Sequence, residues 1–442
     1  MHPFNSNKTA IYRRNKDPNG SVPGAHLRGP RSLATLEPRA VGVDCQIKEL
    51  CQSCEYVNTP YRAGLAAKHA RGLDQLATAG VLEQARVLPP NASPHILNYR
   101  SVAKLAVRPA APRSLEARNG HRFAIGLFEP GSHAVVDLTA CPVHVPAINR
   151  FLQDLRGFLN DSFLAPFNEA SGDGDLRYLT VRAAHLTEEL LVTFVVARPC
   201  KAELRQIAGK LRTLGHKIAS VYMNINSGKG NAIFGPETVP VCGALWLRER
   251  LCDFDFAIGP TSFFQINPWQ AEILYRRIEQ IVATETREAQ ARDVAWDLYC
   301  GAGQIALVLG RAGYQVLGIE ENLEAIAAAE ANALKNRAER SLRFISGRAE
   351  DLTEAIPLGL QSPKLVVANP SRRGIAPSMR KTLGNLAKDA SGRRFIYVSC
   401  DVTTLARDLK DLTASGWKLR QVESFDMFPQ TDKLEWLAVL TT

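Results

Sequence analysis

The second half of the chain alternates short apolar runs with segments of helical periodicity, and this alternation constrains the fold more than any other feature. Four such runs, each followed by a helical pattern, are VAWDLYC, QVLGIE, KLVVANP and RFIYVSC. Strands that alternate with helices form right-handed βαβ units and therefore a parallel, doubly wound sheet. The chain ends in two strand-like runs with no helix between them, which predicts an antiparallel hairpin at the end of this sheet. We expect an α/β, Rossmann-like domain over residues 255–442.

The region before it has a different pattern. Apolar residues recur at helical spacing in YRAGLAAKHARGLDQLATAGV and VPAINRFLQDLRGFLND, whereas RFAIGLFEPGSHAVVDLTA and LLVTFVVARP are rich in β-branched residues. We expect an α+β region over residues 45–254. Residues 1–44 are basic, rich in Pro, Gly and Asn, and without periodicity, which predicts a disordered arm. This arm lacks the strands of a small β-barrel domain.

The net charge of +10 favours an anionic partner, and nucleic acid is the usual one. A mildly basic protein without such a partner is the alternative. No apolar run is long enough to span a membrane, and the first residues lack the apolar core of a signal peptide. We therefore expect a cytoplasmic protein with no membrane partner. In that reducing compartment, a cysteine cluster indicates metal binding or catalysis rather than a disulfide framework.

The first strand of the alternating half runs from Asp297 into a glycine-rich turn that ends at Gly303. Glycine lets the backbone bend tightly, and ligands of open α/β sheets bind beyond the carboxyl ends of the strands. Glu320 ends the second strand, where an acid accepts hydrogen bonds from ribose hydroxyls. The turn lacks the third glycine of the dinucleotide motif, which favours S-adenosyl-L-methionine (SAM) as the cofactor. A plain strand–helix turn is the alternative.

Cys400 ends the apolar strand FIYVSC, at the same edge of the predicted sheet. A lone cysteine on a strand is more often a buried structural residue than a nucleophile. Here, however, the neighbouring strand ends at Asn369, and Arg372 and Arg373 follow it in a polar loop. Because a nearby positive charge lowers the pKa of a thiol, we expect Cys400 to be a reactive nucleophile.

A thiolate beside SAM suits the methylation of an electron-poor ring. Carbon C5 of uracil is a poor nucleophile, but thiolate addition at C6 turns C5 into an enolate carbon that can take the methyl group. A base must then remove the C5 proton so that the thiol can leave. Glu435, in the last hairpin, is the candidate base. A surface or salt-bridged glutamate is the alternative.

Five segments resemble, in order, the successive motifs of the RNA uridine-5-methyltransferases: SFFQINPWQAEILY, WDLYCGAG, VVANPSRRGI, YVSCDVTTLARDL and FDMFPQTDKLEWL. The resemblance extends from about Cys45 to Thr442. It implies that Cys400 is the nucleophile and Glu435 the base. The implied SAM-site positions, with the residues of the glycine turn, are Gln265, Tyr299, Glu320, Asn369, Asp297, Gly301 and Gly303. Phe263 and Phe264 are candidates for stacking on a base, with core packing as the alternative.

Three cysteines, Cys45, Cys51 and Cys54, lie within ten residues of one another. By spacing alone they suit zinc or an iron–sulfur cluster equally, and an all-cysteine site needs a fourth ligand. The resemblance implies Cys141 as that ligand and a [4Fe–4S] cluster as the metal group. It also indicates the ribosomal RNA branch of the family, because the tRNA branch lacks these cysteines. The kind without a barrel domain methylates 23S rRNA at the uridine conventionally numbered 747.

Two positions depart from the family pattern. Ser371 replaces the second proline of the Asn-Pro-Pro-Arg motif, and Asp401 replaces the asparagine that usually follows the nucleophile. Asp401 adds negative charge near the thiol and is expected to raise its pKa. Neither change removes a catalytic group. Two other functions stay open, methylation of tRNA and RNA binding or assembly without catalysis. The oligomeric state also stays open, with a monomer as our expectation.

Overall fold

The computed structural model describes residues 43, 45–111, 120–138, 140–228, 230, 232–283, 293–351, 356–389 and 391–442, all within one unit that extends from Pro38 to Thr442. The predicted basic arm, residues 1–44, lies outside the described residues except for Val43. Within the described ranges, no helix combines the length and the apolar composition needed to cross a bilayer.

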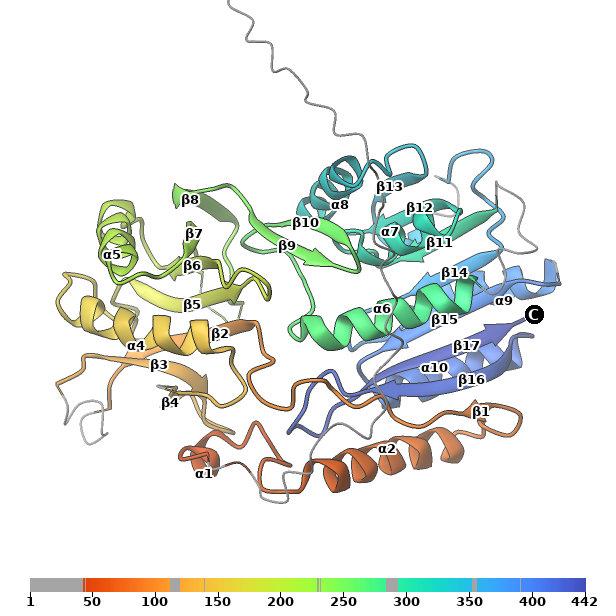
Figure 1. The fold of residues 1–442 in the computed structure, drawn as a ribbon, viewed down its shortest axis with the longest axis horizontal. Helices are drawn as coiled ribbons and strands as arrows, with labels where there is room; N and C mark the ends of the chain where they lie inside the picture. Colours follow the sequence, from red (N-terminus) through yellow and green to blue (C-terminus); the bar gives the residue numbers. More distant parts are fainter. Residues whose placement is uncertain are drawn as a thin grey trace, which may run out of the picture. The chain divides into compact units, whose positions relative to one another are not determined.

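The alternating half of the chain contributes most of a mixed sheet with the strand order β1-β16-β17-β15-β14-β11-β12-β13 (Figure 1). Five neighbouring strands run parallel: β11 (Val294–Leu298), β12 (Gln315–Glu320), β13 (Leu342–Ser346), β14 (Leu365–Ala368) and β15 (Arg394–Ser399). The last two strands, β16 (Lys418–Phe425) and β17 (Glu435–Thr441), form an antiparallel hairpin. The predicted α/β sheet and its terminal hairpin are confirmed. Unexpectedly, β17 pairs with both β15 and β16, so the last strand of the chain is an inner strand.

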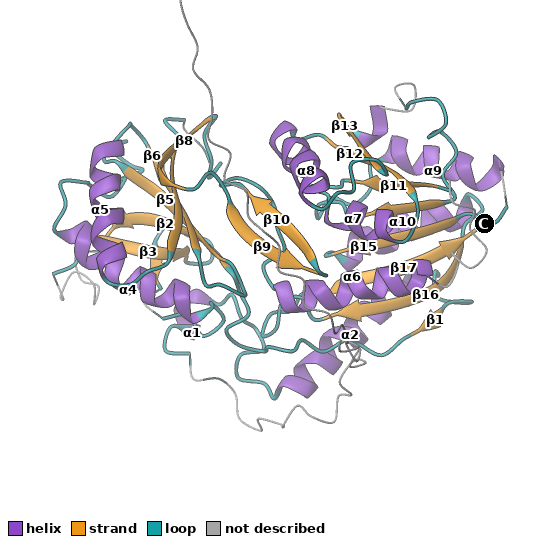
Figure 2. Cartoon of the chain, turned by 45° about the horizontal axis from the view of Figure 1, so that its top comes forward, coloured by secondary structure: helices purple, strands orange, loops and turns teal. Residues whose placement is uncertain are grey.

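Helices cover both faces of this sheet (Figure 2). Successive side chains of a strand point to opposite faces, so each strand contributes to two separate cores. Val367 and Ile396 belong to a core on the face of α6, α7 and α8. Val366 and Phe395, their neighbours in sequence, belong to a core on the face of α2, α9 and α10. The helices are α2 (Tyr61–Thr78), α6 (Pro268–Ala283), α7 (Gln304–Arg311), α8 (Leu323–Lys335), α9 (Pro377–Asp389) and α10 (Val402–Ala414), with a 3-10 turn at Ala349–Asp351.

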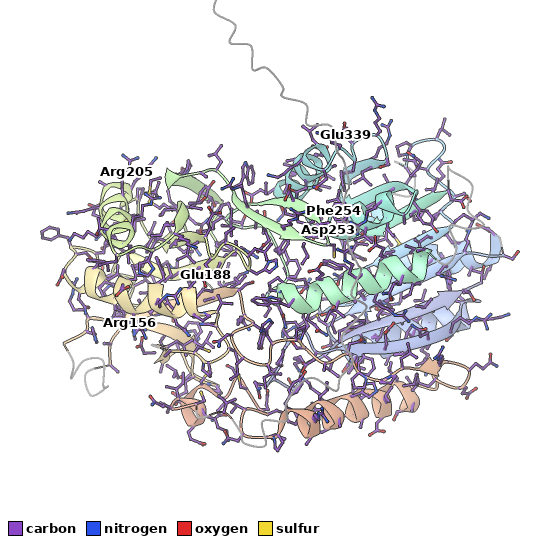
Figure 3. All side chains as sticks on the ribbon, viewed as in Figure 1. Arg156, Glu188, Arg205, Asp253, Phe254 and Glu339 are labelled. Carbon is purple, nitrogen blue, oxygen red and sulfur yellow. The ribbon has the colours of Figure 1, made fainter. Side chains whose placement is uncertain are left out.

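A second sheet, with the order β4-β3-β2-β5-β6-β7-β8, forms most of the earlier region. Its strands are β2 (Val102–Pro109), β3 (Phe123–Phe128), β4 (Val135–Asp137), β5 (Leu176–Ala183), β6 (Leu190–Val196), β7 (Ile218–Ile225) and β8 (Glu237–Gly243). Apolar residues of α4 (Pro146–Asn160) and α5 (Lys201–Thr213) pack into one core with it. Arg156 of α4, labelled in Figure 3, is buried and pairs with Asp137 of β4 at 2.6 Å. This region is therefore α+β, as its sequence pattern predicts.

A short antiparallel hairpin, β9 (Leu247–Leu251) and β10 (Phe254–Ile258), follows the second sheet. Asp253 lies in its turn and Phe254 begins β10, and both are labelled in Figure 3. Arg276 of α6 pairs with Asp253, and the guanidinium of Arg311 of α7 lies 4.3 Å from the centre of the Phe254 ring. The hairpin thus packs against helices α6 and α7 of the alternating half through an ion pair and a cation–π contact.

The segment that precedes the second sheet also packs on the alternating half. After the short helix α1 (Lys48–Cys51), helix α2 lies against α10, and its Leu65 and Leu76 enter the core there. The two-residue strand β1 (Arg86–Val87) then pairs in parallel with β16. Segments far apart in the sequence therefore build the same sheet.

Candidate active site

A cavity of about 1310 Å³ opens where four parallel strands end. Tyr299, Glu320, Asn369 and Cys400 lie at or just after the carboxyl ends of β11, β12, β14 and β15. Ligands of open α/β sheets bind at this edge. The predicted site residues that line the cavity are Gln265, Tyr299, Gly301, Glu320, Asn369, Cys400 and Glu435. The structure thus brings the candidate nucleophile, the candidate base and most of the candidate cofactor residues together.

Glu320 is held by backbone amides at the cofactor end of the cavity. Its Oε2 accepts a hydrogen bond from the Gly301 N–H at 3.2 Å, and its Oε1 accepts one from the Asn322 N–H at 3.0 Å. Gly301 has a φ of 54°, in the left-handed region that favours glycine. The turn and the acid therefore fix each other, and the carboxylate keeps a defined position beside the cavity.

Asp297 and Gly303 do not line the cavity, although the sequence places them among the candidate cofactor residues. Asp297 is fully buried in β11, and burial raises the pKa of its carboxyl to about 8, with the Ala306 amide acting in the opposite direction. Gly303 has a φ of 83° and precedes α7 directly. A Cβ at Gly303 would lie 3.3 Å from the side chains of Ala329 and Phe344. Both residues therefore support the turn through packing inside the fold and do not form part of the cavity wall.

Cys400 is half-buried and follows β15 directly. Burial and the nearby Glu435 raise the pKa of its thiol to about 11, whereas Arg372 acts in the opposite direction. The prediction of a lowered pKa is therefore wrong, because burial and Glu435 outweigh the arginine. Asp401 also raises the pKa, as expected, and its side chain has a structural role: it caps α10 by accepting hydrogen bonds from the Thr403 and Thr404 N–H groups.

Glu435 is the first residue of β17 and is almost completely buried. Burial raises the pKa of its carboxyl to about 8. The alternative of a surface glutamate is thereby excluded. A carboxyl with this pKa accepts a proton more readily than an ordinary glutamate and changes its charge close to neutral pH, which suits a general base.

The two phenylalanines before Gln265 have different environments. Phe264 is buried, with its ring centre 5.5 Å from that of Phe256. Phe263 is 64% exposed and lines the cavity. Core packing therefore accounts for Phe264, whereas Phe263 presents its ring at the site.

Several residues of the cavity wall were not predicted. Arg348 and Glu350 follow β13, so the rule that parallel strands end at one edge could have identified them. Ser53 and Glu55 come from the cysteine-rich segment, and Arg100 directly precedes the second sheet. No sequence pattern links these three residues to the glycine turn or to Cys400. The cavity is thus built from segments far apart in the chain.

The four candidate cluster cysteines gather in one neighbourhood. Cys45, Cys51, Cys54 and Cys141 are half-buried free thiols. Burial and the charges of the other three raise the pKa of the Cys54 thiol to about 12. Asn149 of α4 holds Cys141 in place: its Oδ1 accepts from the Cys141 N–H at 3.2 Å, and its Nδ2 donates to the Cys141 carbonyl at 2.9 Å. Within the described residues, no three His, Cys, Asp or Glu side chains are already arranged as ligands of a single metal ion.

Comparisons with known proteins agree with this geometry. The sequence model of the tRNA (uracil-5-)-methyltransferase family matches residues 115–442. An uncharacterized RNA methyltransferase of Gloeobacter violaceus is 31% identical over 434 residues, which cover 95% of this chain and 90% of the relative. A second uncharacterized RNA methyltransferase, from Geobacter sulfurreducens, is 32% identical over 415 residues, with coverages of 94% and 80%.

A solved structure is similar over most of its length. The tRNA (uracil-54, C5)-methyltransferase of Pyrococcus abyssi, in complex with S-adenosyl-L-homocysteine, superposes with a TM-score of 0.68 and 26% sequence identity. The match covers 88% of this chain and 85% of that chain. The mixed-sheet α/β architecture described above is therefore that of a known methyltransferase.

Proposed function

This chain belongs to the RNA (uracil-5-)-methyltransferase family and methylates C5 of uracil in RNA with SAM as methyl donor; we propose that its substrate is 23S rRNA, at the position equivalent to uridine 747. The observation that carries the substrate proposal is the gathering of Cys45, Cys51, Cys54 and Cys141, because the resemblance associates this cysteine set with the ribosomal RNA branch. The similarity to the Pyrococcus abyssi enzyme favours tRNA as the second candidate substrate.

In the proposed reaction, Cys400 and Glu435 act in sequence. The Cys400 thiolate adds to C6, and the electron pair of the C5–C6 bond passes into the ring as an enolate. C5 then takes the methyl group of SAM, which leaves as S-adenosyl-L-homocysteine. Glu435 removes the C5 proton, the C6–sulfur bond breaks, and the thiolate is released. Arg372 favours the thiolate by lowering the pKa of Cys400. The negative charge of Glu435 disfavours the thiolate, but only once the Glu435 carboxyl has ionised.

We assign the SAM site to the end of the cavity that holds Gln265, Tyr299, Gly301, Glu320 and Asn369. Glu320 faces this end with its carboxylate fixed by two backbone amides, as an acceptor of ribose hydroxyls must be. Phe263, exposed on the wall, is proposed to stack on a base of the RNA. The second sheet and the cysteine-rich segment, residues 45–254, are proposed to bind RNA, and residues 255–442 to carry out methyl transfer.

We further propose that the four cysteines hold a [4Fe–4S] cluster. Soft thiolates are the donors that such a cluster takes. Four free thiols gathered in a partly buried place suit a group that takes cysteine thiolates as its ligands. Anaerobic purification followed by metal analysis tests this proposal, and stoichiometric zinc without iron would refute it.

Tritium release from C5-labelled uracil tests the substrate. Purified protein and SAM are incubated with 23S rRNA and with tRNA transcripts, and Cys400→Ala serves as the inactive control. We expect release from rRNA and none with the variant. Release from tRNA alone would overturn the rRNA proposal, and release from neither RNA would contradict the assigned reaction.

A further inference from the structure

A buried lysine of α2 fastens the segment that leads to Glu435. The side chain of Lys68 is 2% exposed, and its ammonium donates to Asp426 Oδ1 at 2.6 Å, where the Asp426 side chain has no exposure. The same ammonium donates to the carbonyls of Thr431 at 3.1 Å, Lys433 at 3.2 Å and Phe428 at 3.4 Å. A buried charge is costly unless it is paired and hydrogen-bonded, and here the three N–H groups of one cation are shared among four acceptors.

These four acceptors all belong to one irregular stretch, Asp426–Lys433, which we call the hairpin loop. It connects β16 to β17 and ends just before Glu435. Phe428, Thr431, Asp432 and Lys433 line the cavity. The loop therefore has two sides, one that faces the reaction site and one whose carbonyls converge on Lys68.

Other contacts from the same part of the chain add to this arrangement. The Tyr56 N–H donates to the Gln430 carbonyl at 2.9 Å, and the Tyr99 hydroxyl donates to the Pro429 carbonyl at 2.9 Å. Glu55 accepts a hydrogen bond from the Asp432 N–H at 3.1 Å. Each of these contacts reaches one acceptor or donor, whereas Lys68 reaches four along the whole loop.

We propose that Lys68 is a positioning residue: through the hairpin loop it aims the Glu435 carboxylate at C5 of the target ring. The proposal rests on the proposed role of Glu435. It assigns Lys68 no contact with RNA or SAM. Because proton removal depends on the distance and angle between the carboxylate and C5, a loop that relaxes by a fraction of an ångström slows this step selectively.

The order of the reaction separates positioning from mere stability. Thiol addition and methyl transfer come before proton removal, so a misplaced Glu435 leaves the methylated ring attached to Cys400. In a variant that is only less stable, the rates of all steps fall together, in proportion to the folded fraction. The partition between adduct and product is therefore the informative measurement.

The test uses Lys68→Met combined with Asp426→Asn, which removes the pair without leaving one buried charge alone. A second variant, Lys68→Met alone, leaves Asp426, which burial already favours in its protonated, neutral form by raising its pKa, and serves if the double variant does not fold. Lys410→Met, on the exposed side of α10, is the matched control. Each is assayed for tritium release, for the fraction of RNA in a denaturation-resistant adduct, for S-adenosyl-L-homocysteine affinity and for thermal unfolding.

We expect turnover of the double variant to fall by about tenfold to a hundredfold, with a rise in adduct and unchanged S-adenosyl-L-homocysteine affinity. Lys68→Met alone is expected to show the same changes, and Lys410→Met none. A fall in turnover that merely follows the folded fraction, with no rise in adduct in either variant, would overturn the proposal. If Glu435→Gln forms no adduct while the wild type turns over, the assigned base fails and the role of Lys68 fails with it.

Discussion

Cys400 and Glu435 occupy opposite positions on two neighbouring antiparallel strands. Ser399 of β15 pairs with Trp436 of β17 in the register, and each catalytic candidate is one residue further toward the cavity. Residues directly opposite in an antiparallel pair have Cα atoms about 4.5–5.5 Å apart. The register of a single strand pair thus brings the candidate nucleophile and the candidate base close together at the cavity.

The first prediction concerns the fate of the covalent adduct. Glu435→Gln keeps the shape of the side chain but cannot take the C5 proton, so the protein–RNA adduct is expected to survive a denaturing gel in the presence of SAM. The matched control is Glu249→Gln, because Glu249 is also a buried carboxyl but lies outside the cavity wall. Equal amounts of adduct in both variants would remove Glu435 from its role.

The second prediction concerns stability against pH. Burial raises the pKa of folded Glu435 to about 8, above its ordinary value of 4.5. Between these values the folded protein keeps a proton that the unfolded chain has lost, so stability from this group is present at low pH and is lost as pH rises to about 8. Relative to wild type, Glu435→Gln should gain a few kcal/mol from about pH 5 to 8. Urea unfolding measures this, and a pH-independent difference would contradict it.

A third prediction separates crowding from backbone strain in the cofactor turn. Gly303 and Gly313 both have left-handed φ angles, of 83° and 100°, but only at Gly303 would an added Cβ atom have side chains within 4 Å. Alanine at either position should cost about 1–2 kcal/mol of stability from strain. Only Gly303→Ala should also weaken SAM binding, as measured by calorimetry. Equal SAM affinity in the two variants would exclude a role of this close packing.

A fourth prediction concerns the cysteines. Cys54→Ser should lower the iron content of anaerobically purified protein and its broad visible absorbance, because one of the four proposed ligands is lost. Cys242→Ser is the control, since Cys242 is also a half-buried free thiol but lies on β8. Iron loss in both variants, or in neither, would contradict the proposed ligand set.

A fifth prediction concerns RNA binding. Stacking of one base on an aromatic ring is worth about 1–3 kcal/mol, so Phe263→Ala should raise KM for RNA by roughly fivefold to a hundredfold. Leu334→Ala removes an exposed apolar side chain of α8, outside both the cavity wall and the proposed RNA-binding region, and should leave KM unchanged. If the two variants have the same KM, Phe263 does not stack on the substrate.

The parts of the site that sequence analysis predicts well are those that depend on local order. Tyr299, Glu320, Asn369 and Cys400 lie at or just after the ends of parallel strands in one sheet, and such ends meet by the geometry of βαβ units. Alternation of strand and helix is visible in the residues themselves. This alternation is therefore enough to predict that the four positions meet at one edge of the sheet.

Other parts depend on packing between distant segments. The apolar pattern of β17 is that of any buried strand, so it does not indicate that β17 lies between β15 and β16. The nearby Arg372 predicts a lowered pKa for Cys400. Burial and Glu435 raise this pKa instead, and neither effect can be seen in the sequence around Cys400. Lys68 reads as one polar residue in an amphipathic helix, and only the fold shows its four acceptors.

The inner position of β17 also has a consequence for the time at which the enzyme becomes active during synthesis. A ribosome delivers the chain from its N-terminus, so β15 and Cys400 emerge before the strand that must lie beside them. The edge of β15 stays unpaired, and the candidate base is absent, until β17 has also left the ribosome. A nascent chain thus carries the thiol without Glu435, and the two candidate groups meet only after β17 has emerged.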